Sequence, residues 1–295
     1  MLTGNVGNYL RTMEVRNEQG LSREQIEEAR NNRISLQGAC RTMPSDNARL
    51  RIHVLASGSK GNASLIENIA TGEGILIDCG ICKRDVLSRS AEAGFDLGKL
   101  KAVLVTHEHS DHFHEGTCER LVRESNCRFV IPVSCLKKAA ELGIPDERIF
   151  AARPGMDFEY KGIGVHAVRA LHGHLEGSIY EGASLFDCGY LLDFCGRRIY
   201  EPGDTVLLQE HIEKIRDVDA LFFSPTEHNM WIEQSLKLIT HLRPRHIFPQ
   251  HFDTFFVTPE NAFWTIGFPD EVYERLDEEM KQAYHKLGQG ELFVI

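Results

Sequence analysis

The sequence predicts an α/β fold over residues 50–295, preceded by an N-terminal helical extension over residues 1–49. From Leu50 onward, short runs rich in β-branched and aromatic residues are separated by glycine and polar turns, as strands are. Stretches with helical spacing alternate with the later runs. Because no internal repeat or flexible linker interrupts this pattern, we expect one body with an appended segment.

Short apolar runs bounded by turn residues predict the strands of this body. They are R-I-H-V-L-A (51–56), A-S-L-I-E-N (63–68), G-I-L-I-D (74–78), A-V-L-V-T (102–106), R-F-V-I-P (128–132), G-Y-L-L-D-F (189–194), R-R-I-Y (197–200), A-L-F-F (220–223) and H-I-F-P (246–249). A further strand-like run, G-V-H-A-V, covers residues 164–168.

Helices are predicted over residues 86–94 and over residues 135–143, where Gly143 ends the second helix. Near the C-terminus one amphipathic packing helix is expected, with Gly288 at its C-cap. Its apolar face would carry Val272, Leu276, Met280, Ala283 and Leu287.

Residues 1–49 differ from the rest because they are polar and rich in Asn, Arg and Gln. Ser22 and Gln25 form a capping box ahead of I-E-E-A-R and predict a short exposed helix. We interpret the extension as an arm that packs on the body or on a second copy in a homo-oligomer. A substrate lid is the alternative.

The composition excludes several classes of protein. With 33 Lys+Arg against 43 Asp+Glu the net charge is −10, which disfavours electrostatic binding of nucleic acid over a large surface. The net charge does not exclude a local basic groove. The sequence shows neither a secretory signal nor a membrane span, so we expect a cytoplasmic protein. Its eight scattered cysteines are more typical of reduced thiols than of a disulfide framework. Cys79 and Cys82 form a C-x-x-C pair, but no second pair is present to complete a four-cysteine zinc site.

The strongest chemical signal is T-H-E-H-S-D-H at residues 106–112, directly after the apolar run A-V-L-V. His107 and His109 stand two residues apart and can point to the same side of an extended segment. Beyond the turn, Asp111 and His112 can reach a second position close by. Imidazole and carboxylate ligands suit zinc, with manganese or iron as alternatives, so the spacing indicates two adjacent metal sites.

Two metal ions need more ligands than one segment supplies, and later strand ends provide them. His172 and His174 follow the run at 164–168, Asp204 follows the run at 197–200, and His251 follows the run at 246–249. A ligand at a strand end projects from a rigid support. Of the two neighbouring histidines, His172 has the better position, and His174 is the alternative.

These residues resemble the H-x-H-x-D-H motif and later ligands of the metallo-β-lactamase superfamily. The resemblance covers residues 50–255 and implies a four-layer αβ/βα sandwich with two metals at one edge. It assigns His107, His109 and His172 to one metal and Asp111, His112 and His251 to the other, with Asp204 as the bridge. Residues 50–295 would then form a hydrolase domain.

Two branches of the superfamily are represented. L-A-S-G-S-K-G-N-A (55–63), I-L-I-D-C-G (75–80) and the motif around His107 resemble an exonuclease-like branch associated with bacterial cell-wall regulation. The A-x-H run, the P-G-D-T turn and I-F-P-Q-H-F-D-T-F resemble the branch that includes ascorbate-phosphate lactonase. We therefore expect a lactonase-type hydrolase of a small anionic cyclic ester, with a phosphodiesterase or nuclease as the alternative. A third hypothesis is a metal-binding interaction protein whose N-terminal arm recruits a partner. The retention of every expected ligand argues against it, because scaffolds that have lost activity often lose ligands.

In the expected mechanism a hydroxide that bridges the two metals attacks the substrate. Asp111 would orient this hydroxide and relay its proton. His228, in S-P-T-E-H-N-M-W (224–231), could donate a hydrogen bond to the leaving group, and Glu227 and Trp231 could also face the cleft. The competing interpretation makes His228 an ordinary helix-entry residue.

Supporting roles follow from position. Asp78 could accept a hydrogen bond from a ligand imidazole or simply cap a turn, and Glu108 should face away from the metals. Thr205 could support the Asp204 loop. Lys60 could meet a phosphate, although a turn explains the same residues. We expect turn or ligand-loop support roles for Ser57, Ser59 and Ser110. Aromatic residues of F-D-T-F-F, which starts at Phe252, could line the pocket or belong to the core, as could Phe263 and Trp264.

Overall fold

A computed structural model of the chain describes residues 48–174, 178–226, 228–252 and 268–295, which contain two β-sheets. The first sheet has the strand order β13-β1-β2-β3-β4-β5-β6. Its strands are β1 (Leu50–Ala56), β2 (Ala63–Asn68), β3 (Gly74–Ile77), β4 (Leu100–Leu104), β5 (Arg128–Pro132), β6 (Ile149–Ala152) and β13 (Leu292–Val294). Neighbours from β3 to β6 are parallel, whereas β13, β1, β2 and β3 pair antiparallel.

The second sheet has the order β12-β11-β10-β9-β8-β7. Its strands are β7 (Asp157–Tyr160), β8 (Ile163–Arg169), β9 (Cys188–Phe194), β10 (Arg197–Glu201), β11 (Ala220–Phe223) and β12 (His246–Pro249). The pairs from β7 to β10 are antiparallel, and β10, β11 and β12 run parallel. Every run predicted as a strand is confirmed, and β6, β7 and β13 are strands that the sequence did not predict.

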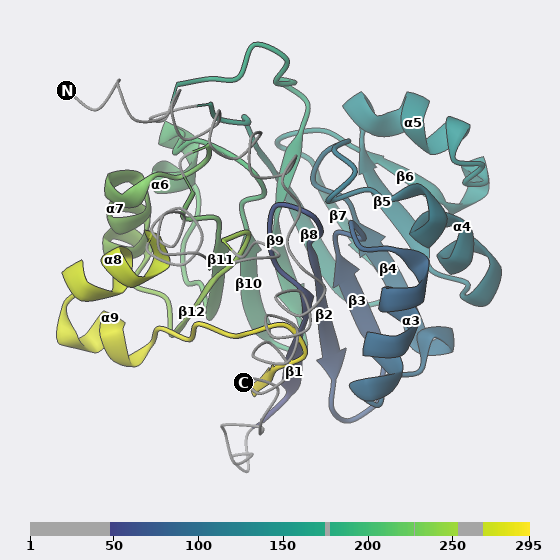
Figure 1. Cartoon of the computed structure of the whole chain (residues 1–295), viewed down its shortest axis with the longest axis horizontal. Coiled ribbons are helices and arrows are strands. Elements are labelled where there is room, and N and C mark those ends of the chain that lie inside the picture. Colours follow the sequence, from purple (N-terminus) through teal and green to yellow (C-terminus); the bar gives the residue numbers. More distant parts are fainter. Residues whose placement is uncertain (1–47, 175–177, 227, 253–267) are drawn as a thin grey trace, which may run out of the picture. The chain divides into compact units, whose positions relative to one another are not determined.

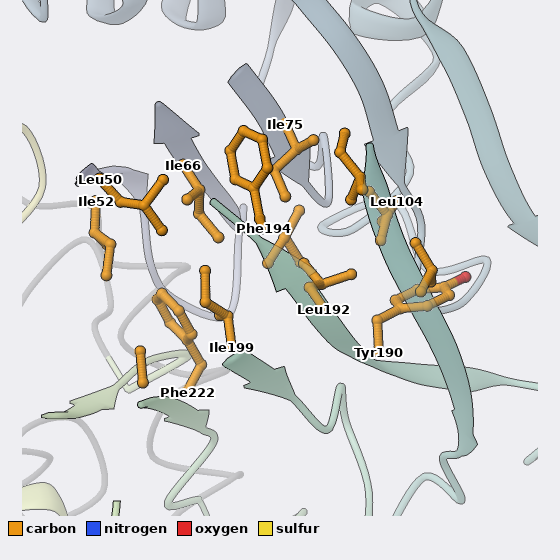
Figure 2. Close-up of a cluster of buried hydrophobic side chains, with 14 of the residues drawn as sticks. Leu50, Ile52, Ile66, Ile75, Leu104, Tyr190, Leu192, Phe194, Ile199 and Phe222 are labelled. Atoms are coloured by element: carbon orange, nitrogen blue, oxygen red, sulfur yellow. The ribbon is translucent and has the colours of Figure 1, made fainter. Parts of the chain in front are cut away.

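The main core lies between the two sheets. Figure 2 shows Leu50, Ile52 and Ile66 of the first sheet gathered with Leu192 and Ile199 of the second. These side chains are buried, and removing such apolar surface from water contributes roughly 25 cal/mol per Å². The inward positions alternate along each strand, so this core fixes which face of each strand looks inward.

Helices cover the two outer faces (Figure 1). On the first sheet these are α3 (Lys83–Glu92), α4 (Glu115–Glu124) and α5 (Leu136–Glu141), and on the second α6 (Gln209–Glu213), α7 (Ile232–Leu242), α8 (Phe268–Arg275) and α9 (Glu278–Gln282). Three 3₁₀ turns complete the elements of the described residues: η1 (Leu97–Lys99), η2 (Val133–Cys135) and η3 (Asp146–Arg148). Each outer layer has its own apolar cluster, so the predicted four-layer α/β sandwich is confirmed.

The single C-terminal helix expected from Val272 to Leu287 is wrong. The chain forms α8 and α9 instead, because the side chain of Asp277 accepts a hydrogen bond from the backbone N–H of Met280 and starts a new helix. The apolar face was nevertheless correct, since all five of its residues are buried: Val272, Leu276, Met280, Ala283 and Leu287.

Several predictions fall outside the described residues. These are the capping box of Ser22 and Gln25, the role of the arm, Glu227, Phe263 and Trp264. Every cysteine in the described part is a free thiol, as expected. Among the described helices, none is long and apolar enough to cross a bilayer.

Candidate metal centre

The segment with three histidines forms a tight loop between β4 and α4. The backbone N–H groups of His112 and Phe113 both donate to the carbonyl of His109, at 3.0 and 2.8 Å, which turns the chain back. The loop then packs against Gly80, where an added Cβ would stand 1.6 Å from the carbonyl oxygen of Asp111. Only glycine permits this close approach, so the sequence after β3 shapes the loop.

Residues from four separate segments converge beside this loop. His107, His109, Asp111 and His112 come from the loop itself, and the others follow β8, β10 and β12. They form three overlapping groups in which the ligand atoms lie within 4.8 Å of one another: His107, His109 and His172; His107, His112 and Asp204; and Asp111, His112 and His251. All seven side chains singled out by the sequence are therefore neighbours.

Asp204 lies between the groups. Its Oδ2 is 3.1 Å from His251 Nε2, 3.5 Å from His112 Nε2 and 3.6 Å from His172 Nε2. The Oδ2 of Asp111 is 3.2 Å from His251 Nε2 and 3.5 Å from His112 Nε2, so it belongs to one side only. The carboxylate of Asp204 could therefore contact an ion in either group, as a bridging ligand must.

Hydrogen bonds orient the imidazoles so that their Nε2 atoms face the cluster. His112 Nδ1 donates to Asp78 Oδ2 at 2.7 Å, and His172 Nδ1 donates to the carbonyl of Gly173 at 2.7 Å. Thr106 Oγ1 donates to Asp78 and accepts from His107 Nδ1 at 3.1 Å. Asp78 therefore makes the hydrogen bond to an imidazole that the sequence suggested, and metal-bound histidines need such a second hydrogen bond.

The cluster fits divalent metal ions. The Nε2 atom of His107 is buried and has no hydrogen-bond partner among the described residues, whereas Nε2 of His251 faces the carboxylates of Asp111 and Asp204. A buried, unsatisfied nitrogen costs about 1–3 kcal/mol, and a bound cation would satisfy it. Imidazole nitrogens together with two carboxylates form the donor set that zinc, manganese and iron accept.

Charge within the cluster is strongly coupled. Burial alone would raise the pKa values of Asp111 and Asp204, but hydrogen bonds and charge from His112 and His251 hold both well below the usual range. Burial opposes the charging of His251, yet Asp204 and Asp111 raise its pKa to about 10. Without metal the carboxylates thus stay ionised against protonated imidazoles, and metal binding would displace those protons.

The structure distinguishes between His172 and His174 as candidate ligands. His172 belongs to a ligand group, whereas His174 is exposed, belongs to none of these groups and has its ring 6.4 Å from the ring of Tyr180. Tyr180 was missed by the sequence analysis, although its ring lies 5.7 Å from His172 and 6.4 Å from His109. It lies in a loop without a distinctive pattern, so only the folded chain reveals it.

Of the proposed substrate contacts, His228 is exposed, with its ring 6.3 Å from that of His174. Partial desolvation by neighbouring protein atoms, together with the charges of His172 and His174, lowers the pKa of His228. Trp231 is partly buried and packs against the apolar cluster beneath α7. Glu108 is exposed, as expected for a residue that points away from the cluster.

The glycine-rich turn at residues 57–62 supports the centre. Ser57 Oγ accepts a hydrogen bond from the backbone N–H of His251 at 2.9 Å. The backbone N–H of Asn62 donates to the carbonyl of Asp111 at 2.7 Å, and its side-chain Nδ2 lies 3.3 Å from His112 Nε2. Thr205 supports the Asp204 loop, since its Oγ1 accepts from the backbone N–H of Leu171 at 2.9 Å. The turn therefore has a structural role, and Lys60 projects from it exposed.

A cavity of about 720 Å³ borders the loop on the side of Glu108 and Ser110. Among the candidate ligands only His109 lines it, together with residues of α4 and α5 such as Gly116 and Lys138. The cavity therefore adjoins the centre at one ligand and does not enclose it.

Comparison with known proteins agrees with this geometry. Residues 74–252 match the family described as the beta-lactamase superfamily domain. A UPF0173 metal-dependent hydrolase of Pyrococcus furiosus is 26% identical over 223 residues, which span 73% of this chain and 90% of that protein. A protein of Salmonella heidelberg described as "Probable L-ascorbate-6-phosphate lactonase UlaG" is 26% identical over 123 residues, 38% of this chain and 35% of that protein.

Among solved structures, the metallo-beta-lactamase fold protein YhfI of Bacillus subtilis superimposes with a TM-score of 0.62. It shares 13% identity, and the alignment covers 84% of this chain and all of that one. Zn²⁺-bound PqqB of Methylobacterium extorquens gives a TM-score of 0.60 at 12% identity, covering 82% of this chain and 99% of that one. At these identities the likeness concerns the fold.

Proposed function

The chain belongs to the beta-lactamase superfamily as a metal-dependent hydrolase, and from this premise we propose that it opens a small anionic cyclic ester at a dinuclear centre. One observation carries the proposal: seven imidazole and carboxylate side chains from four segments surround one small volume. A structural role alone does not explain the buried Nε2 of His107, which has no hydrogen-bond partner among the described residues.

Two ions would be held by distinct sets of residues. We assign one to His107, His109 and His172 and the other to Asp111, His112 and His251, with Asp204 in contact with both. Zinc is the first choice, and manganese and iron are alternatives. When bound, such ions lower the pKa of a coordinated water from 15.7 to about 7 and polarise the ester carbonyl.

The protein's own side chains have the remaining proposed roles: proton transfer, hydrogen bonding to the leaving oxygen and orientation of the imidazoles. Asp111 accepts the proton of the attacking water and orients it, since its carboxylate lies within the cluster and is ionised over a wide pH range. His228 donates a hydrogen bond to the leaving oxygen from the rim, next to His174. Asp78 and Thr106 keep the ligand imidazoles of His112 and His107 in their tautomers.

The lactone class is supported by the likeness to the UlaG-type lactonase, which covers 38% of this chain. Opening a lactone requires one hydrolytic attack on a carbonyl carbon and leaves a carboxylate and a hydroxyl group on one product. Phosphodiester cleavage could use the same two-metal arrangement, and it forms the second arm of the test.

The test is a substrate panel on the metal-loaded protein. It compares phosphorylated and unphosphorylated sugar lactones with cyclic nucleotides, single-stranded DNA and bis(p-nitrophenyl) phosphate. We expect turnover of the lactones, faster for the phosphorylated ones. Turnover confined to phosphodiesters would reject the lactonase proposal and leave the hydrolase.

A further inference from the structure

A buried carboxylate outside the ligand set lies between two of its loops. Glu201 is the last residue of β10 and is 0% exposed. Among the described residues, its carboxylate forms no ion pair with a lysine, arginine or histidine. A buried carboxylate costs several kcal/mol unless hydrogen bonds satisfy it, so its partners indicate why it is there.

Each oxygen of Glu201 contacts the residue that precedes a candidate ligand. Its Oε1 accepts a hydrogen bond from the backbone N–H of Gly203 at 3.0 Å, next to Asp204. Its Oε2 accepts one from Nε2 of Gln250, next to His251. One carboxylate therefore joins the two loops directly.

The connection crosses a strand. β11 lies between β10 and β12 in the sheet, so Glu201, at the end of β10, and Gln250, directly after β12, follow strands that are not neighbours (Figure 1). The backbone N–H of Gln250 also donates to the carbonyl of Phe223 at 2.9 Å, which fixes that end of the link to β11. Beyond the link, Asp204 Oδ2 and His251 Nε2 stand 3.1 Å apart.

The other end is equally constrained. Gly203 has a φ of +70°, and an added Cβ there would lie 3.2 Å from the Cβ of Thr106. The turn that carries Asp204 therefore packs against the residue before His107. A shift of this turn would move Asp204 relative to both ligand groups.

We propose that Glu201 is a positioning residue of the metal centre, which holds Asp204 and His251 at the spacing required to bind metal by hydrogen-bonding Gly203 and Gln250. The inference rests on the proposed metal site but concerns its affinity rather than its substrate. Glu201 touches none of the seven candidate ligands and acts only through the two loops.

The test compares Glu201→Leu, Glu201→Gln and Gln250→Ala in the full chain. Zinc affinity is measured by competition with a chromophoric chelator, and the absorption spectrum of the Co²⁺-loaded protein reports ligand geometry. Loss of the link should weaken zinc binding about tenfold to hundredfold in Glu201→Leu and alter its cobalt spectrum. Glu201→Gln retains an acceptor for Gly203 and an amide that Gln250 can pair with, so it should remain close to wild type.

Glu67→Leu is the matched control. Glu67 is also a buried carboxylate, bonded to His53 at 2.9 Å and Arg51 at 3.1 Å in the first sheet, without contact with a candidate ligand. It should destabilise the fold and leave zinc affinity unchanged. If Glu201→Leu does not fold, Gln250→Ala provides the same test.

The swap E201Q/Q250E preserves an amide–carboxylate pair and should recover most of the affinity lost on breaking it. Unchanged zinc affinity in both Glu201→Leu and Gln250→Ala would overturn the inference, as would a loss no greater than that of Glu67→Leu at matched stability. Wild-type protein that binds no metal would instead refute the proposed function.

Discussion

At the residue scale, Asp111 is the side chain to which the proposed mechanism assigns the proton transfer. It contacts His251 and His112 on one side of the cluster, whereas Asp204 contacts histidines of both sides. In the proposed centre Asp111 would therefore serve one ion, whereas Asp204 would touch both.

Asp111→Ala should lower kcat by at least about 100-fold, because proton transfer by a positioned side chain contributes about 10²–10⁴-fold. The side chain is only partly buried, so the free energy of unfolding should change by less than about 1 kcal/mol. Steady-state kinetics, urea unfolding and metal analysis check this together. Near-normal turnover at full metal content would exclude Asp111 from the proton transfer.

A second residue-scale prediction concerns pH. Burial, with a smaller contribution from the charge of Asp78, raises the pKa of Glu201 to about 8, so the folded state favours its protonated form. The raised pKa of Glu201 stabilises the folded state. This stabilisation is fully present below the ordinary pKa of a glutamate and is lost as the pH rises towards 8.

Metal-free Glu201→Gln should therefore lose less stability than wild type between about pH 5 and pH 8. The measurement is urea unfolding of both proteins across this range. If the free energy of unfolding changed with pH in the same way in both proteins, Glu201 would not titrate with a raised pKa in the folded state.

At the element scale, the loop between β4 and α4 depends on the end of β3. The backbone N–H of Cys79 donates to the carbonyl of His112 at 2.8 Å, and Gly80 lies against Asp111. The short segment after β3 thus sets the position of Asp111 and His112.

Gly80→Ala should displace this loop, because its Cβ would overlap the carbonyl of Asp111. We expect a loss of about 1–3 kcal/mol in stability together with weaker zinc binding. Gly94→Ala is the comparison, since it places a methyl group in open space at a φ of +73° and tests backbone strain alone. Equal zinc affinities in the two variants would show that the loop tolerates the displacement.

The elements also show which patterns a sequence can and cannot predict. β1 to β5 were predicted because β-branched runs bounded by turns are distinctive. β7 was not, because D-F-E-Y on the sheet edge is half polar, and β13 is a three-residue strand that exists only by pairing with β1. Asp277 split the last helix because a local cap outweighed a continuous apolar face.

At the scale of the whole molecule, the sequence gives the candidate ligands in order but no distances between them. The family resemblance supplied their grouping, and folding brings His172, Asp204 and His251 to the loop at His107. The position of Tyr180 beside His172 and the hydrogen bonds of Glu201 could not be predicted, because both arise only from tertiary packing. Charge patterning did not help either, since Glu201 is buried by tertiary contacts.

The most direct test of the dinuclear centre is anomalous X-ray diffraction from zinc-loaded crystals. We predict two zinc peaks about 3.5–4 Å apart, with Asp204 in contact with both and His172 rather than His174 bound to one. A single peak, or peaks outside the seven side chains, would contradict the dinuclear centre.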